Sequence, residues 1–117
     1  MTFMFEDLTV YQKAMNLVEG VYKVIKAVPE KEIKDQMKRA ALSIPLNIAE
    51  GNGRNTLKER SQFYKTARGS LFECIPLLQF CLRLGLIPKE QYERQYSLAE
   101  EIGKMLNGLI NSLEKSS

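Results

Sequence analysis

A chain of 117 residues, with 44% hydrophobic and 26% charged side chains, has the size and composition of one globular domain rather than of a disordered segment. It contains no His and carries a net charge of only +3, so the commonest general base and metal ligand near neutral pH is missing. This excludes Ser-His-Asp active sites and His-ligated metal centres, and no uncharged apolar run reaches the ~18 residues of a membrane-spanning helix.

The first predicted helix covers residues 8–28. Asp7 is its expected N-cap, and Pro29 ends it because proline restricts the backbone of the residue before it. Apolar residues recur at three- and four-residue spacing along the segment, as in one face of a helix, and they are Leu17, Val18, Val21, Ile25 and Val28.

The second predicted helix covers residues 30–50, with its apolar stripe at Ile33, Met37, Ala40, Ala41, Ile44 and Ile48. Gly51 follows as the expected C′ residue, a position where positive φ favours glycine. The third predicted helix, residues 56–84, begins with Thr56 and Glu59 at the spacing of a capping box and ends before Gly85.

The fourth predicted helix covers residues 88–114 and begins at Pro88, a residue type favoured in the first turn. Four amphipathic helices with short connections predict an all-α fold, an antiparallel up-down four-helix bundle over residues 1–117. Pro45 and Pro76 lie inside the second and third helices, where each is expected to produce a kink. Cys74 and Cys81, about 10 Å apart along one helix, are expected to be buried core residues rather than a disulfide or metal site.

Two helices carry apolar residues away from their core stripes. On a helical wheel, Leu42, Leu46 and Ala49 lie opposite the stripe of the second helix, and Phe72 points away from the stripe of the third. Such a row favours subunit association over scattered surface hydrophobics, so these four residues are the predicted oligomer interface.

Positive charge is concentrated in the middle of the chain. Residues 31–68 hold nine Lys and Arg against four acidic residues, whereas each remaining segment is slightly acidic. A basic excess of this kind is either a phosphate-binding surface or a solvated face. The candidate nucleic-acid-binding residues are Lys34, Lys38, Arg54, Lys58, Lys65 and Arg68.

A polar stripe borders the core side of the second helix, formed by Gln36, Arg39, Ser43, Asn47 and Glu50. Glu50 lies at a helix C-terminus, where the helix dipole disfavours an anion, so it is expected to pair with Arg39 or Arg54. Asn47 can bond backbone groups left open near Pro45. The stripe is interpreted as a structural network, with a binding or catalytic role as the alternative.

Three segments carry a resemblance to a known family: residues 5–14, residues 36–54, which read QMKRAALSIPLNIAEGNGR, and residues 67–73. They resemble the four-helix bundle proteins encoded within intervening sequences of bacterial 23S rRNA genes, and this resemblance covers nearly the whole chain. That family is similar to the accessory variability determinant of diversity-generating retroelements, a pentameric bundle. The resemblance implies a homopentamer and nucleic-acid binding, and it implies no settled biochemical activity.

The leading functional hypothesis is a non-enzymatic homo-oligomer that binds RNA or DNA through backbone phosphates without reading bases. The alternative is a protein-interaction scaffold whose outer apolar row binds a partner protein. Neither hypothesis requires a cofactor, a metal or a membrane. Because the N-terminal residues lack the basic region and cleavage site of a signal peptide, the expected location is cytoplasmic.

Overall fold

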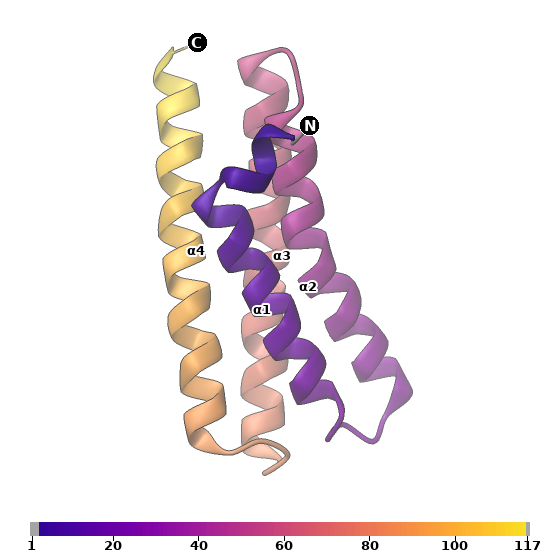
Figure 1. Ribbon diagram of the computed structural model, residues 1–117. Helices are drawn as coiled ribbons and strands as arrows, with labels where there is room; N and C mark the ends of the chain where they lie inside the picture. The colour runs from indigo at the N-terminus through magenta and orange to yellow at the C-terminus, as the bar shows by residue number, and fades with distance from the viewer. Residues whose placement is uncertain (1–2, 117) are drawn as a thin grey trace.

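The computed structural model describes residues 3–116, so the ends of the expected domain, residues 1–2 and 117, lie outside the described part. A short 3-10 helix, η1 (Met4–Asp7), precedes four α-helices: α1 (Thr9–Ile25), α2 (Lys31–Asn52), α3 (Leu57–Arg83) and α4 (Lys89–Ser116). No strand occurs between residues 3 and 116. Successive helices run in opposite directions (Figure 1), which confirms the predicted all-α up-down bundle.

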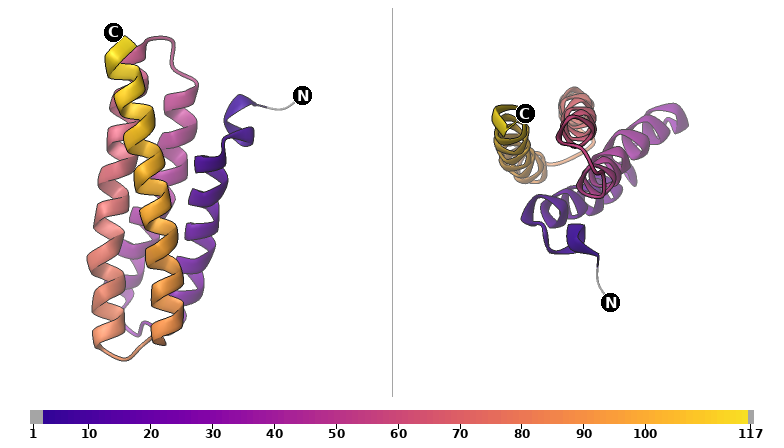
Figure 2. Two further views of the ribbon diagram at one scale, coloured as in Figure 1. Left: turned by 90° about the vertical axis from the view of Figure 1, so that its left-hand side faces the viewer. Right: turned by 90° about the horizontal axis from the view of Figure 1, so that it is seen from above.

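The helices surround one core in the order α1, α2, α3, α4, and α4 returns to contact α1. Among the described residues, neither α1 and α3 nor α2 and α4 make close backbone contacts, so these two pairs lie diagonally across the bundle. Figure 2 shows this arrangement from above, with α1 and α2 inclined to α3 and α4. Features on the outer faces of α2 and α4 therefore lie on different sides of the molecule.

The core contains the apolar stripes predicted for the first two helices, together with one buried face of each of the other two. The largest fully buried side chains include Leu17 of α1, Ile44 of α2, Leu78 of α3 and Leu106 of α4. Cys74 and Cys81 are both free and buried, as expected. Pro45 and Pro76 lie inside α2 and α3, and the kink expected at each stays a prediction.

The ends of the helices agree only partly with the predictions. The Thr56 hydroxyl accepts a hydrogen bond of 3.1 Å from the amide of Glu59 and thereby caps α3. Gly85 follows α3 with a φ of 71°, the left-handed conformation expected of a glycine at a helix end. The prediction for Asp7 is wrong, because Asp7 belongs to η1 and Leu8 occupies the N-cap position of α1 without a side-chain cap.

The prediction for Gly51 is also wrong. Gly51 is a helical residue of α2, which continues to Asn52. A Cβ atom at this position would lie 2.9 Å from the Cβ of Phe63 and 3.0 Å from a ring carbon of Tyr64. Glycine is therefore needed here because α2 and α3 approach each other closely, not because the backbone turns.

Two other glycines allow a simple test of helix propensity. A Cβ atom at Gly69 in α3, or at Gly108 in α4, would meet nothing within 4 Å. We expect Gly69→Ala and Gly108→Ala each to raise the free energy of unfolding by about 0.5–1 kcal/mol, because alanine loses less backbone entropy in a helix. Urea denaturation measures the change, and a lower midpoint would mean that assembly covers that face.

Candidate functional site

The six basic residues predicted to contact phosphates separate into two groups. Lys34 and Lys38 lie in the first two turns of α2. The other four, Arg54, Lys58, Lys65 and Arg68, lie beyond α2 or on α3. Lys38 lies against the Tyr22 ring of α1, 5.9 Å from its centroid, whereas Lys65 and Arg68 of α3 contact α4. The six residues therefore do not form one continuous surface.

Three of the six contribute to a cationic row along α3. Lys58 is exposed in the first turn. The Lys65 ammonium pairs with the Glu114 carboxylate at 2.9 Å, and the Arg68 guanidinium donates to the Asn107 side-chain oxygen at 2.9 Å. These contacts join α3 to α4 at the surface and leave both cations within reach of solvent.

Arg54 is built into the connection between α2 and α3. Its guanidinium pairs with the Glu50 carboxylate at 2.9 Å and lies over the Phe63 ring, 4.7 Å from the centroid. Its backbone carbonyl accepts a 2.8 Å hydrogen bond from the Nε of Arg60. The pairing expected for Glu50 is confirmed with Arg54, and phosphate binding by Arg54 stays a prediction.

The predicted polar stripe is only partly a network. The Asn47 amide donates to the backbone carbonyl of Ser43 at 2.8 Å and to its hydroxyl at 2.9 Å. The Ser70 hydroxyl donates to the Ser43 hydroxyl at 2.7 Å, which ties α2 to α3. Gln36 and Arg39 are exposed on α2 and do not join these bonds. Sequence reasoning missed Ser70, because nothing in its own helix marks it as a partner of α2.

The predicted oligomer interface falls on two separate surfaces. On α2, Leu46 is 65% exposed and Leu42 is 38% exposed, while Ala49 is half-buried. On α3, Phe72 is 60% exposed. Phe72 borders a groove that α4 completes, so the α2 residues and Phe72 do not share a surface.

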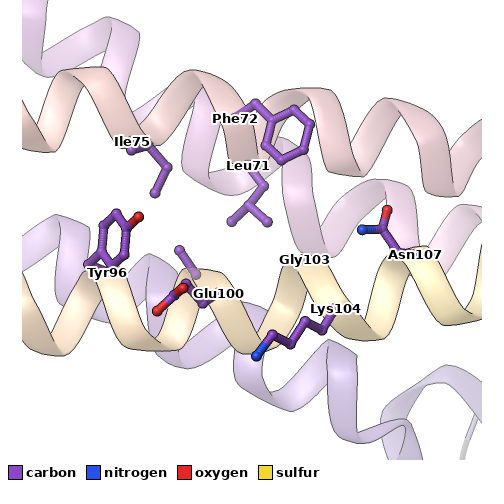
Figure 3. A pocket seen from close by; sticks show the side chains of 9 residues that line it. Leu71, Phe72, Ile75, Tyr96, Glu100, Gly103, Lys104 and Asn107 are labelled. Atoms are coloured by element: carbon purple, nitrogen blue, oxygen red, sulfur yellow. The ribbon is translucent and has the colours of Figure 1, made fainter.

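We call this second surface the α3–α4 groove (Figure 3). It has a volume of about 280 Å³. Its α3 wall consists of Leu71, Phe72 and Ile75, and its α4 wall consists of Tyr96, Ala99, Glu100, Gly103, Lys104 and Asn107. The α4 contribution was not predicted, although the small residues Ala99 and Gly103 at i, i+4 spacing could have indicated a gap on one face of that helix.

The two thiols are poor nucleophiles. Burial, together with the nearby Glu73 charge, raises the pKa of Cys74 to about 12, and burial raises the pKa of Cys81. Since the thiolate is the reactive form, both side chains are inert near neutral pH. Within residues 3–116, no cluster of three or more His, Cys, Asp or Glu side chains could hold a metal ion. The described helices include none that is long and apolar enough to cross a membrane.

Comparison with known proteins gives a fold relative and a family. A crystal structure from Bacteroides thetaiotaomicron, of a protein with unknown function from the S23 ribosomal protein family, is similar to this chain with a TM-score of 0.80. The two sequences are 23% identical, and the similarity covers 87% of this chain and 98% of that one. A search of the curated proteins gave no significant match. The profile of a family described as 23S rRNA-intervening sequence protein matches residues 6–108, so the chain belongs to the 23S rRNA-intervening sequence protein family.

Proposed function

We propose that this protein is a non-enzymatic, self-associating helical bundle that binds RNA or DNA through backbone phosphates. The observation that carries the proposal is the cationic row of α3, formed by Lys58, Lys65 and Arg68. All three residues project from one helix and reach solvent. Their spacing of seven and three residues corresponds to about 10 Å and 5 Å along the helix axis.

The partners of these cations do not prevent phosphate binding. The Lys65–Glu114 ion pair is a surface pair, with side chains 38% and 52% exposed. Pairs of this kind contribute about 0–1 kcal/mol, so a phosphate can compete for the cation. Arg68 donates to a neutral amide oxygen, and its guanidinium can engage a phosphate through two parallel hydrogen bonds.

Self-association would increase the affinity. One row of three cations gives a weak attraction, but repetition of the row in an assembly allows several contacts with one nucleic acid strand. The family resemblance suggests five copies, and the exposed Leu46 and Phe72 support association without fixing a number. Phosphate contacts position a protein without reading bases, so binding should tolerate changes in sequence.

The test compares the parent protein with the triple variant Lys58→Gln, Lys65→Gln, Arg68→Gln in titrations of duplex and single-stranded RNA and DNA at several salt concentrations. We expect weaker binding by the variant. Its salt slope should fall by about 0.9 for each duplex phosphate that the variant no longer binds, or by about 0.7 for each single-strand phosphate. Circular dichroism and light scattering should show unchanged helicity and assembly size.

A matched control removes the same charge elsewhere. Lys23 and Lys26, at the end of α1, and Lys115, in the last turn of α4, are exposed. Their joint substitution by Gln should leave affinity and salt slope nearly unchanged. If both triple variants weaken binding equally, net charge rather than the α3 row is responsible, and the proposed surface is wrong.

The alternative function is a protein-interaction scaffold, which the exposed apolar surfaces on α2 and in the α3–α4 groove favour. The same titration separates the two functions. A parent protein that binds none of the four nucleic acids at low salt would contradict the first proposal and leave the scaffold.

A further inference from the structure

We infer that the outer strip of α2 in one copy docks into the α3–α4 groove of a second copy, with the two bundles parallel. The α2 strip consists of Arg39, Leu42, Leu46 and Glu50. The inference rests on the proposed self-association and identifies which two surfaces form the contact. Leu46 and Phe72, at 65% and 60%, are among the most exposed large apolar side chains of the described residues.

The dimensions of the two surfaces match. The α4 wall of the groove extends from Tyr96 to Asn107, eleven residues or about 16 Å along the helix. The two leucines of the strip are four residues apart, about 6 Å, so both fit within that length. Leu71, only 2% exposed, lies at the base of the groove, and a Cβ atom at Gly103 would be in ordinary contact with it at 3.5 Å. Figure 3 shows Leu71 directed toward α4 between Phe72 and Tyr96, so an incoming leucine would pack on Leu71 between these two rings.

Charge selects the parallel orientation. Arg39 lies at the N-terminal end of the α2 strip and Glu50 at its C-terminal end. They are eleven residues apart, which equals the length of the α4 wall. On that wall Glu100 precedes Lys104. With the ends of the strip and the wall aligned, the parallel orientation places Arg39 four residues, or about 6 Å, from the level of Glu100, and Glu50 three residues, or about 5 Å, from the level of Lys104. The antiparallel orientation brings like charges equally close. Like charges facing each other across an interface are unfavourable.

The preference for the parallel orientation depends mainly on two side chains. Arg39 and Glu100 are both exposed, and neither has an ion-pair partner among residues 3–116. Glu50 already shares its charge with Arg54. An interchain pair between Arg39 and Glu100 would give both of these charges a partner.

The geometry of the bundle makes this contact heterologous. Because α2 and α4 lie diagonally across the bundle, the strip and the groove are on different sides of each copy. A contact between two different surfaces continues from copy to copy, and it closes into a ring when the rotation permits. In a ring whose axis runs along the bundles, all copies point in the same direction, so neighbouring bundles must be parallel.

The first test mixes two complementary variants. Leu46→Glu damages only the strip, and Phe72→Glu damages only the groove. Both residues are more than half exposed, so both variants should keep the parent's helicity. Light scattering at micromolar concentration should report an assembled parent and a monomer for each variant alone. An equimolar mixture should form a heterodimer, because it retains one intact strip and one intact groove.

Phe80→Glu is the matched control. Phe80 lies on the same helix as Phe72, is 43% exposed and does not line the groove, so this variant should assemble like the parent. If either Leu46→Glu or Phe72→Glu remains assembled alone, or if their mixture stays monomeric, the assigned contact is wrong while self-association stands. A monomeric parent would overturn both.

The second test reverses charge. Arg39→Glu and Glu100→Arg should each raise the dissociation constant of the assembly about fivefold, the effect of losing an interaction of about 1 kcal/mol. The double variant should recover most of the parent's affinity. If the double variant does not assemble more tightly than either single variant, the parallel orientation is wrong.

Discussion

Gly51→Ala is expected to lower the free energy of unfolding by about 2 kcal/mol. The new methyl group would lie 2.9 Å from the Cβ of Phe63, and a contact this short forces α2 and α3 apart at the end where they join. For a domain of this size the decrease corresponds to a melting temperature lower by about 8 °C. Thermal and urea denaturation of the purified variant measure it.

Gly53→Ala provides the matched control two residues away. Gly53 has a φ of −87°, which any residue adopts, and its added methyl group would meet only backbone oxygens at 3.7 Å and 3.8 Å. This variant should be as stable as the parent or slightly more stable. Equal stability of the two variants would show that α2 and α3 can separate at little cost, contrary to the close packing described above.

Gly51 also shows where sequence reasoning reached its limit. A glycine followed by Asn52, Gly53 and Arg54 has the composition of a helix end, and the local pattern alone favours positive φ. The helix nevertheless continues to Asn52, and a glycine is needed at position 51 because Phe63 and Tyr64 of the next helix occupy the space of a side chain there. That requirement is tertiary and cannot be derived from spacing within one helix.

The parts of the fold that were predictable depend on periodicity and on strong breakers. The buried residues Leu17 and Val21 recur at the spacing that predicted the first helix, and Gly85 has the positive φ expected at a helix end. The short helix η1 was missed. Contacts between aromatic rings, such as that of Phe5 with Tyr11 at 4.9 Å, accompany it, and four residues are too few to show a period.

The contacts of the candidate site also divide into predictable and unpredictable ones. The Arg54–Glu50 pair was predictable, since it follows from i, i+4 spacing and from an acid at a helix C-terminus. The partners of the α3 row, Glu114 and Asn107, were not predictable. Their identification requires knowing which face of α4 lies beside α3, and apolar periodicity fixes that rotation only to within one or two residues.

Cys74 should react several hundredfold more slowly with iodoacetamide in the folded protein than in urea. Burial and the nearby Glu73 charge raise its pKa from 9.0 to about 12, so at pH 9 about one molecule in a thousand carries the thiolate, against half of the unfolded molecules. The variant Cys81→Ala leaves Cys74 as the single thiol, and mass spectrometry follows its alkylation. Cys74→Ala reports on Cys81 in the same way.

The raised pKa also predicts how stability depends on pH. The folded state holds the Cys74 proton between pH 9 and 12 while the unfolded state releases it, so the stabilisation is fully present below pH 9 and is lost as pH rises toward 12. In Cys81→Ala, the free energy of unfolding should fall by up to about 1.4 kcal/mol per pH unit over this range through this group. Other groups titrate here too, so the relevant quantity is the difference from the double variant Cys74→Ala, Cys81→Ala. A difference that stays constant from pH 8 to 10.5, or rapid alkylation of the folded protein, would show that the Cys74 thiol reaches solvent from the core.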